Sequence, residues 1–493
     1  MKRYLAFDLG AESGRAIVGT LENRKLALDE IHRFPTGGMH INGTFRWDIY
    51  RLYEEVKEGI KKYVQKYGPE VESIGVDTWG VDFGLLDRKG QLIGIPYHYR
   101  DSRTEGTDTI IEEVMGKENL YRCTGIQFLI INTLNQLISM VKSNDPSLEI
   151  ATDMLFIGDL LHYFLTGRIC TEYTVASISQ LYDVTEDNWS DKIFNSFKIP
   201  DNLKTRIIRA GERIGKVRDD VARETGISEN VWVTAPPVHD TASAAVAIPA
   251  IGDDWAYISS GTWSIAGLEL EKPVINKESF EMNISNSGGA LGKSLFLKNV
   301  MGLWIIQQCK KIWDRKEEGL NYSEIVGRAQ RVEGFLGYID PDDSIFLNPE
   351  NMPVAVSEYL SKTGQKAVDP GDIGAIAHIV YVSLALKYKY VFEKLSRAAS
   401  KKINAVHITG GGSKNEMLNQ FTANAMGVKV ITGPVEATAI GNIMMQAYGS
   451  GILESLDDIR KVIRDSFEVK EYEAEDCIEW STAYKQFLKI CNL

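Results

Sequence analysis

Cysteine is scarce in this sequence, and the cysteines present form no recognisable site. Five of the 493 residues are cysteines, none in a Cys-x-x-Cys pair or at the spacing of zinc ligands. An odd and scattered set is typical of isolated thiols in a reducing compartment and excludes a disulfide framework. The first residues, MKRYLAFDLG, lead directly into a predicted strand rather than a signal peptide. We therefore expect a cytoplasmic protein.

Excess positive charge and long apolar runs are absent as well. The formal net charge is −12 and the pI is about 5.3, values that argue against nucleic-acid binding and against attraction to an anionic membrane. No run of about 18 apolar residues stands out, so no membrane span is predicted. An anionic ligand would have to be held by local groups and a metal ion, because the overall field of the protein is negative.

The N-terminal part has the pattern of a mixed α/β sheet. Residues 3–33 predict three antiparallel strands separated by the turns AESG and NRK. An amphipathic helix follows, with Asp48 in position to cap it and Gly68 at its end. Two more strands are expected around Thr78, Trp79 and Gly80. Three strands, a helix and further strands are the order of an α/β fold, whereas residues 105–200 are expected to be mainly helical.

The pattern of the first strands recurs later in the chain. Residues 255–270, WAYISSGTWSIAGLEL, again predict a strand, a turn of Gly, Ser and Thr, and a second strand. Residues 404–430 add a strand, three consecutive glycines, a helix and another strand. We therefore predict two α/β lobes, residues 1–244 and residues 245–493, each opening with a glycine-rich hairpin.

Both hairpin turns are candidate anion sites. Successive backbone N–H groups in a Gly/Ser/Thr turn form a concave array that binds phosphate, and glycine lets the phosphate approach closely. The first turn includes Asp8 and the second spans Ser260 to Thr262. Asp8 would repel a phosphate unless Mg²⁺ lay between them, so Asp8 is the candidate metal contact. The alternatives are ordinary hairpins whose glycines only supply positive φ angles, and an Asp8 carboxylate bonded to its own turn.

Two further glycine-rich segments differ in what they indicate. In TGGGSKNEM, residues 409–417, a strand ends and a helix begins, so helix N–H groups can face an anion or a nucleotide. No GxGxxG is present, which argues against a dinucleotide site, and a tight strand–helix turn is the alternative. SGGALGKS, residues 287–294, resembles a P-loop. However, Ser287 stands where the first glycine is required, so we interpret the segment as a hairpin turn.

The segment APPVHDTASAAVA, residues 235–247, places an acid at the junction of the two predicted lobes. Asp240 follows a strand and precedes a run of small residues. One interpretation is a helix N-cap, a common role for aspartate. The other is a general base that accepts a proton from a hydroxyl attacking the terminal phosphate of a nucleotide, with the small residues letting the helix start approach the cleft. His239 is then a hydrogen-bonding neighbour of the base.

An ordered set of short motifs gives the sequence a family resemblance. Between about residues 4 and 445 it contains, in order, FDLGAESGR, IGVDTWGVDF, YRDSRT, GIQF, HDTASA, SSGTWS, KNVMGLW, GGGSKN and GPVEATAIGN. Together these motifs resemble the FGGY carbohydrate kinases. The resemblance implies two actin-like, ribonuclease H-type lobes that close on ATP and a sugar, with Mg²⁺ as the metal ion.

The resemblance also implies roles for individual residues. Asp240 matches the family's proton acceptor, and Asp8 resembles the acid that meets Mg²⁺, through water. The sugar-contacting positions correspond to Gly80, His239, Asp240, Thr241 and Asn299. The ATP-contacting positions correspond to Ala11, Glu12, Ser13, Gly14, Arg15, Thr262, Gln307 and Gly411. Two features depart from the usual pattern: Glu12 replaces a smaller residue, and FIGDLLHYFLTG stands at residues 156–167.

Within the family, DTWGVDF, GIQF and KNVMGLW are most similar to kinases of L-rhamnulose that act on its C1 hydroxyl, and L-fuculose is the alternative sugar. A base at the bottom of a cleft reaches a terminal hydroxyl more easily than a ring hydroxyl, and the net charge of −12 favours a neutral acceptor. An actin- or chaperone-like ATPase would share the hairpins, but no residues remain for a peptide-binding domain. The YRDSRT loop suits a polyol, and a solvated turn is the alternative. The oligomeric state is left open between a monomer and a small homo-oligomer.

Overall fold

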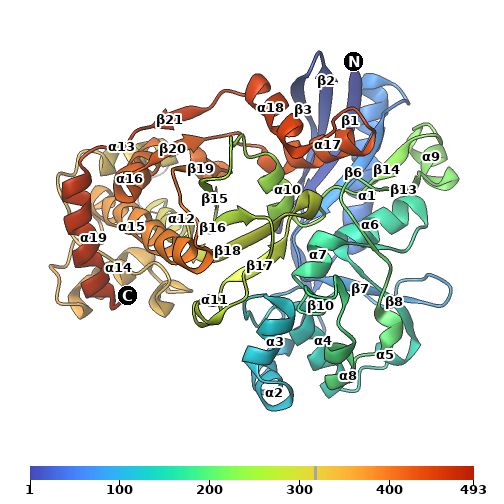
Figure 1. Ribbon diagram of the computed structural model, residues 1–493, viewed down its shortest axis with the longest axis horizontal. Helices are drawn as coiled ribbons and strands as arrows, with labels where there is room; N and C mark the ends of the chain where they lie inside the picture. Colours follow the sequence, from blue (N-terminus) through green and yellow to red (C-terminus); the bar gives the residue numbers. More distant parts are fainter. Residues whose placement is uncertain (316–318) are drawn as a thin grey trace. The chain divides into compact units, whose positions relative to one another are not determined.

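The computed structural model describes residues 1–315 and 319–493, whose elements are labelled in Figure 1. They form two compact units. The first unit comprises Met1–Pro249, Glu269–Phe296 and Ala437–Phe467, and the second comprises Ala250–Leu268, Leu297–Glu436 and Glu468–Leu493. The chain therefore passes between the units several times, where the sequence predicted one division at 244/245. The two returning segments join the first unit through long-range packing, for which local sequence patterns carry no signal.

The first unit is built on a six-stranded mixed sheet with the strand order β13-β14-β6-β1-β2-β3. Its strands are β1 (Lys2–Leu9), β2 (Ser13–Glu22), β3 (Lys25–Pro35), β6 (Ser73–Thr78), β13 (Arg213–Lys216) and β14 (Trp232–Thr234). The antiparallel pairing of β1, β2 and β3 confirms the predicted meander, whereas β1, β6 and β14 are parallel. The residues that follow β1, β6 and β14 therefore meet at one edge of the sheet.

Alternation along β1 gives this sheet two buried faces. Leu5 and Phe7 pack in an apolar cluster with α1 (Ile49–Tyr67), α6 (Ile157–Thr166) and α9 (Asp219–Thr225). Tyr4 and Ala6 pack in another with α10 (Asp240–Val246), α17 (Ala437–Gly449) and α18 (Leu456–Ser466). The predicted helix after Asp48 is α1, and the Asp48 side chain caps it.

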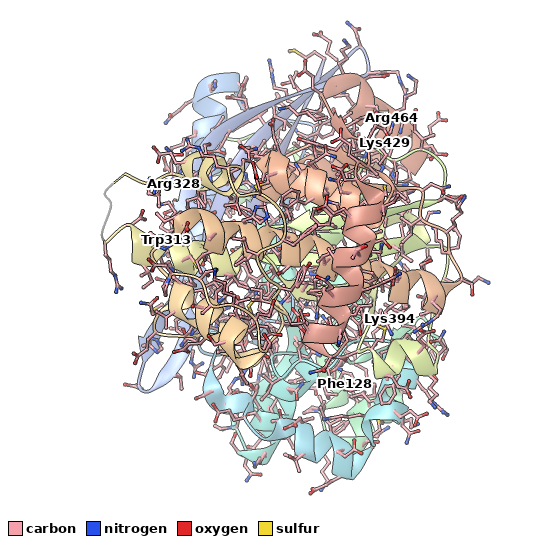
Figure 2. All side chains as sticks on the ribbon, turned by 90° about the vertical axis from the view of Figure 1, so that its left-hand side faces the viewer. Phe128, Trp313, Arg328, Lys394, Lys429 and Arg464 are labelled. Atoms are coloured by element: carbon pink, nitrogen blue, oxygen red, sulfur yellow. The ribbon has the colours of Figure 1, made fainter. Side chains whose placement is uncertain are left out.

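Smaller elements fill the rest of the first unit. The helices are α2 (Thr107–Val114), α3 (Lys117–Thr124), α4 (Thr133–Lys142), α5 (Ser147–Ile150), α7 (Tyr173–Ser177), α8 (Asp191–Ser196) and α11 (Lys277–Glu281). Two-stranded pieces pair β4 (Gly38–Ile41) with β5 (Thr44–Trp47), β7 (Phe83–Asp87) with β8 (Ala151–Phe156), β9 (Thr171–Glu172) with β12 (Ile207–Ile208), and β10 (Tyr182–Asp183) with β11 (Asn188–Trp189). Phe128, labelled in Figure 2, packs in a cluster of three rings with Tyr121 and Phe280. The expectation of a mainly helical stretch at 105–200 is confirmed.

A second sheet has the strand order β17-β18-β16-β15-β19-β20-β21. Its strands are β15 (Trp255–Ser260), β16 (Trp263–Leu270), β17 (Ser285–Gly288), β18 (Ser294–Met301), β19 (Ala405–Thr409), β20 (Lys429–Thr432) and β21 (Lys470–Tyr472). The succession β18-β16-β15-β19-β20 repeats the succession β3-β2-β1-β6-β14, and the β15–β16, β15–β19 and β19–β20 pairs have the same directions as their counterparts. The predicted internal repeat is therefore confirmed as a repeat of topology. Residues 287–294 turn from β17 into β18, as predicted.

Helices from several parts of the chain complete the second unit. They are α12 (Trp304–Trp313), α13 (Tyr322–Ala329), α14 (Met352–Lys362), α15 (Ile373–Ala399), α16 (Glu416–Met426) and α19 (Cys477–Cys491). Trp313, labelled in Figure 2, ends α12, and its indole N–H donates to the Pro370 carbonyl at 3.4 Å. By length and composition α15 is apolar enough to cross a membrane, but 89 % of its most apolar window is buried within the protein. Such burial is typical of the core helix of a globular domain.

Candidate functional site

The turn between β1 and β2 holds the residues predicted to contact phosphate and metal. Asp8 and Arg15 are register partners on the two strands, and Arg15 Nη2 lies 2.5 Å from Asp8 Oδ2. Gly10 N closes the turn by donating to Ser13 O at 3.0 Å, and the tip of the turn is exposed. Residues 11–15 thus form an accessible turn above a buried carboxylate that is already paired with a cation.

The backbone conformation does not require glycine at three positions of the predicted phosphate turns. Gly10, Gly261 and Gly411 all lie outside the positive-φ region, and a Cβ added to any of them would meet at most one carbonyl oxygen, at 3.5 Å or more. The interpretation that the hairpin glycines only supply positive φ is therefore wrong. Open space beside the backbone is what close approach of a ligand requires. Gly14 differs, because its Cβ would lie 2.4 Å from the Phe34 ring, so packing explains it.

A second buried carboxylate, missed in the sequence analysis, lies beside Asp8. Asp77 is the register partner of Asp8 on the parallel strand β6 and is fully buried. Its Oδ2 accepts a hydrogen bond from Asn442 Nδ2 at 2.6 Å, and its Oδ1 has no hydrogen-bond partner among the described residues. Burial, followed by the charge of Asp8, raises the pKa of Asp77 well above its usual value. The available sequence signal was an acid inside the apolar strand IGVDT.

Side-chain amides of α17 fix the surroundings of Asp77. Gln446 Nε2 donates to Asn442 Oδ1 at 2.7 Å and to the Leu5 carbonyl at 3.2 Å. Gln446 Oε1 in turn accepts from Ser73 Oγ at 2.6 Å. All of these groups are buried, so a late segment of the chain orients the amide that meets the carboxylate at the sheet edge.

Asp240 begins α10, which starts at the same edge of the first sheet. The N-cap of α10 is His239, and Asp240 is the first helical residue, with Oδ1 accepting from Thr241 N at 2.6 Å. The N-cap interpretation of Asp240 is therefore wrong. About a third of its side chain, 33 %, is exposed, and the burial of the remainder raises its pKa to about 6. At neutral pH the carboxylate is mostly ionised yet more basic than a surface aspartate, which suits proton acceptance.

His239 is a neutral neighbour of this carboxylate. Its Nε2 lies 3.6 Å from Asp240 Oδ1, and burial lowers its pKa to about 4. Its Nδ1 is buried and has no hydrogen-bond partner among the described residues. A Cβ added to Gly80 would lie 3.5 Å from His239 Cδ2. The structure therefore brings together Gly80, His239, Asp240 and Thr241.

The small residues after Asp240 face another helix. The α10 residues 241–246 are buried, and α17 crosses them so closely that a Cβ on Gly441 would lie 1.8 Å from Ser243 O. Backbones approach this closely only where the side chains between them are small or absent. The run thus serves helix–helix packing, and the expectation that it also lets the helix start approach a cleft stays a prediction.

The YRDSRT loop is braced by specific contacts. Asp101 Oδ2 accepts from Phe45 N at 2.6 Å, and Asp101 Oδ1 accepts from Arg103 N at 3.0 Å. The Arg103 guanidinium donates to Gln136 Oε1 at 2.7 Å and stacks 3.7 Å from the centre of the Tyr97 ring. The alternative of a solvated turn is therefore wrong, and the loop is an ordered wall of the first unit.

In the second unit, the β15–β16 turn is joined to the start of α12. Gly261 N donates to Trp263 O at 3.0 Å within the turn, and Trp304 N donates to the Thr262 carbonyl at 3.1 Å. Gln307 lies in the first turn of α12. Thr262 and Gln307, two of the predicted ATP-contacting residues, are therefore held close together by backbone hydrogen bonds.

Gly411 opens a 3₁₀ turn, Gly411–Lys414, at the end of β19. This turn packs on the end of β15, because a Cβ on Gly412 would lie 1.9 Å from Ser260 Oγ. The helix α16 starts only at Glu416, where the Asn415 side chain caps it. The predicted direct passage from the glycines into a helix is thus corrected: the N–H groups next to Gly411 belong to the 3₁₀ turn.

Two predicted contacts remain to be located: the sugar contact Asn299 and the contact with a metal ion. Asn299 lies on β18 in the second unit, whereas the other predicted sugar-contacting residues lie in the first. Within residues 1–315 and 319–493, no group of three or more His, Cys, Asp or Glu side chains could hold a metal ion. Asp8 supplies one carboxylate, so a divalent ion there would take its remaining ligands from phosphate oxygens and water.

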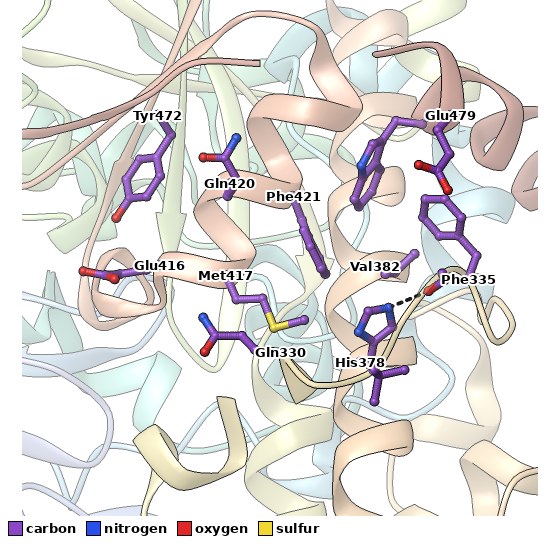
Figure 3. Close-up of a pocket in the computed structure, with 13 residues that line it drawn as sticks. Gln330, Phe335, His378, Val382, Glu416, Met417, Gln420, Phe421, Tyr472 and Glu479 are labelled. Carbon is purple, nitrogen blue, oxygen red and sulfur yellow. Dashed lines mark hydrogen bonds between the residues drawn. The ribbon is translucent and has the colours of Figure 1, made fainter. Parts of the chain in front are cut away.

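Cavities within the separate units lie apart from these residues. The cavity in Figure 3, of about 460 Å³, belongs to the second unit and is lined by aromatic rings around His378, whose Nε2 lies 3.0 Å from the Gly334 carbonyl. Neither Thr262 nor Gly411 lines it. A cavity of about 1100 Å³ in the first unit is lined in part by Glu172 and does not include Asp240. These two cavities therefore do not include the predicted site residues at the sheet edges.

Comparisons with known proteins define the family. The model of the N-terminal domain of the FGGY family of carbohydrate kinases matches residues 3–247, and the model of its C-terminal domain matches residues 256–450. A rhamnulokinase of Bacteroides thetaiotaomicron is 40 % identical over 486 residues, with 99 % of each chain covered. A rhamnulokinase of Bacillus subtilis is 37 % identical over 485 residues, with 98 % of each chain covered. The chain belongs to the FGGY family of carbohydrate kinases.

Solved structures support the same fold. A ligand-bound xylulose kinase from Lactobacillus acidophilus superposes with a TM-score of 0.82 at 15 % identity, covering 100 % of this chain and 98 % of that one. Glycerol kinase from Plasmodium falciparum with ADP gives a TM-score of 0.75 at 18 % identity, with 99 % and 98 % covered. The predicted α/β fold with two actin-like lobes is confirmed, and the protein is a carbohydrate kinase.

Proposed function

We propose that the protein transfers the γ-phosphoryl group of ATP to the C1 hydroxyl of L-rhamnulose, giving L-rhamnulose 1-phosphate and ADP. The observation that carries the kinase chemistry is Asp240, an ionisable carboxylate with 33 % of its side chain exposed and its pKa raised to about 6. In this reaction Asp240 accepts the hydroxyl proton while the sugar oxygen attacks phosphorus. The sugar identity is supported by relatives named rhamnulokinase, at 35–40 % identity over nearly the full chain.

The sugar is held, in this proposal, by the residues around Asp240. Neutral His239 and the adjacent Thr241 and Gly80 are the proposed contacts of the sugar beside the base. Asn299 is a further proposed contact from β18. Neutral hydrogen-bonding groups suit a neutral ketose, and a site that bonds specific hydroxyls discriminates strongly against sugars that lack them.

ATP is held, in this proposal, by the two glycine turns and the segments bonded to them. The proposed contacts are Ala11, Glu12, Ser13, Gly14, Arg15, Thr262, Gln307 and Gly411. The open space beside Gly10, Gly261 and Gly411 supports close approach of phosphate to backbone N–H groups. Transfer from bound ATP to the sugar then depends on positioning and on charge stabilisation of the phosphoryl group.

Mg²⁺ fits the carboxylate edge of the first sheet. The Asp8 carboxylate stands at this edge, directly before the β1–β2 turn, and Asp77 lies beside it on the neighbouring strand. Mg²⁺ commonly uses one or two carboxylates and completes its shell with water and substrate phosphate, so one acid suffices. Asp8 would hold the ion through water, and the ion would neutralise charge on the phosphates. We further propose a cytoplasmic location, in keeping with the scattered thiols.

The decisive experiment is a coupled ADP-release assay with L-rhamnulose, L-fuculose, L-xylulose and glycerol. We expect L-rhamnulose to give the highest kcat/KM by a clear margin, and the product to carry phosphorus at C1 in a ³¹P–¹³C NMR spectrum. A clear preference for L-fuculose or another sugar would overturn the sugar assignment. ATP turnover that ignores all sugars but responds to unfolded protein would overturn the kinase reaction as well.

A further inference from the structure

Glu172 is a buried acid that the proposed phosphoryl transfer does not use. It ends β9, caps the short helix α7, and is fully buried. Its Oε2 accepts hydrogen bonds from Thr174 N at 2.9 Å and from Thr174 Oγ1. Its Oε1 has no partner among the described residues. The hydrogen bonds of this carboxyl group to the described residues therefore all converge on Oε2.

The same two side chains also bind the backbone that precedes Asp240. Glu172 Oε2 accepts from Val238 N at 3.0 Å, and Thr174 Oγ1 accepts from His239 N at 3.1 Å. The Thr174 hydroxyl also donates a hydrogen bond to Glu172 Oε2, so the two side chains form one continuous hydrogen-bonded unit. Two consecutive amides immediately before Asp240 are therefore held by a capping motif that is about 65 residues earlier in the chain.

The segment has few other ways to be held. β14 ends at Thr234 and α10 begins at Asp240, and residues 236 and 237 between them are prolines, which have no N–H to donate. The Ala235 amide donates to Glu212 O at 2.9 Å. Val238 and His239 thus provide the remaining amides of the connection, and both bind to Glu172 or Thr174.

The carbonyl groups of the segment before Asp240 accept further hydrogen bonds, which also depend on the position of this segment. Thr78 N donates to the Val238 carbonyl at 2.8 Å, and Ser243 Oγ donates to the Pro237 carbonyl at 3.0 Å. The carbonyl contacts fix the segment to β6 and to α10, while the amide contacts fix it to α7. Burial raises the pKa of Glu172 to about 7, and Oε2 can accept hydrogen bonds whether or not Oε1 is protonated.

We propose that Glu172 and Thr174 are positioning residues that hold Val238 and His239 so that the Asp240 carboxylate is aimed at the sugar hydroxyl. The inference rests on the proposed role of Asp240 as base. It predicts that loss of the Thr174 hydroxyl lowers turnover without loss of nucleotide binding. A small misplacement of a reacting group costs up to about 10²-fold in rate, so a loss of this order or somewhat smaller is expected.

The test compares Thr174→Val with Thr225→Val. Thr225 is also buried, its hydroxyl donates to Val221 O at 2.8 Å, and its Oγ1 accepts from Ile227 N at 3.4 Å, but it lies on α9. We expect T174V to lower kcat with L-rhamnulose at least about 10-fold, to leave the ADP affinity unchanged, and to shift the acid limb of kcat/KM. T225V should change the melting temperature alone, and T174S should restore most of the turnover because it restores the hydroxyl.

Glu172→Gln gives a second measurement, since the amide oxygen can still accept the three hydrogen bonds. We expect E172Q to keep more activity than T174V. Turnover and acid limb of T174V equal to those of T225V would overturn the positioning role. Full activity of Asp240→Asn would instead overturn the proposed base, so the two failures are distinguishable.

Discussion

The two sheets share a topology, but the ends of their central strands differ in charge. In the first unit the central parallel pair carries Asp8 opposite Asp77, with Arg15 bonded to Asp8. In the second unit the corresponding pair ends with Ser259 opposite Thr409, followed by glycine turns. A charged edge suits a metal ion and proton transfer, whereas a neutral edge with glycine turns suits phosphate oxygens without repulsion. Duplication of one fold thus produces two chemically different edges.

The strongest test of the charged edge is Asp240→Asn. The amide keeps the shape of the side chain but removes its basicity, so we expect kcat to fall by about 10²–10⁴-fold. ATP binding should survive, because its proposed contacts lie in the hairpins and the 3₁₀ turn. Steady-state kinetics and titration of a fluorescent ATP analogue measure the two effects. Near-normal turnover would restrict Asp240 to a structural role.

The pH dependence of kcat/KM is a second test of Asp240 as the base. Because the pKa of Asp240 is raised to about 6, kcat/KM should rise with pH through about 6 and then level off. His239 should add nothing above pH 5, since its pKa is lowered to about 4 and it stays neutral there. A profile flat from pH 5 to pH 8, measured with the wild-type enzyme under conditions where it remains folded, would contradict a base at Asp240.

Asp8→Asn tests the metal at the charged edge. If Asp8 meets Mg²⁺ through water, its loss should weaken the apparent Mg²⁺ affinity or activity by about 10–100-fold. The measurement is initial rate against Mg²⁺ concentration at saturating ATP, with the melting temperature recorded because Arg15 loses its 2.5 Å partner. A metal titration identical to wild type would leave Asp8 as a partner of Arg15 only.

Much of the difference between the two sheet edges could be predicted from the sequence, because the residues that define it stand in local sequence patterns. Asp8 stands at the end of a predicted strand before a turn, and Asp240 stands before a run of small residues, so both patterns can be recognised without a structure. Asp77 was missed because only the register of β6 against β1 places it beside Asp8. Glu172 was missed for the same reason, since its contact with Val238 joins segments far apart in the chain. The helix packing of the run after Asp240 was also missed, because its partner, Gly441, comes from α17.

Gly411→Val tests the neutral edge. No atom lies within 4 Å of a Cβ at this position, so the substitution should not disturb packing. The larger side chain would occupy the space proposed for the nucleotide, and we expect ADP to bind about 10-fold more weakly, or about 1.4 kcal/mol. The sugar affinity should not change. Gly412→Val is the contrasting variant, because its Cβ would lie 1.9 Å from Ser260 Oγ and it should lower stability instead.

Among these variants, Asp77→Asn should have the smallest effect on turnover. The reason is the raised pKa of Asp77. Burial and the charge of Asp8 raise the pKa of Asp77, which disfavours its ionised form, and an amide is a close replacement for a neutral carboxyl group. We expect kcat at pH 7 to change by no more than about twofold.

The pH dependence of the stability of Asp77→Asn tests the direction of the pKa shift of Asp77. A carboxyl group whose pKa is raised in the folded state favours folding at low pH, and that contribution is lost as pH rises from the unfolded value of 3.8 toward the folded one. D77N should therefore lose less stability than wild type over this pH range, measured by urea unfolding from pH 5 to pH 8. An Asp77 that is ionised in the folded protein and needed as a direct metal ligand would give the opposite pair of results: a large loss of turnover, and no gain in stability at the higher pH.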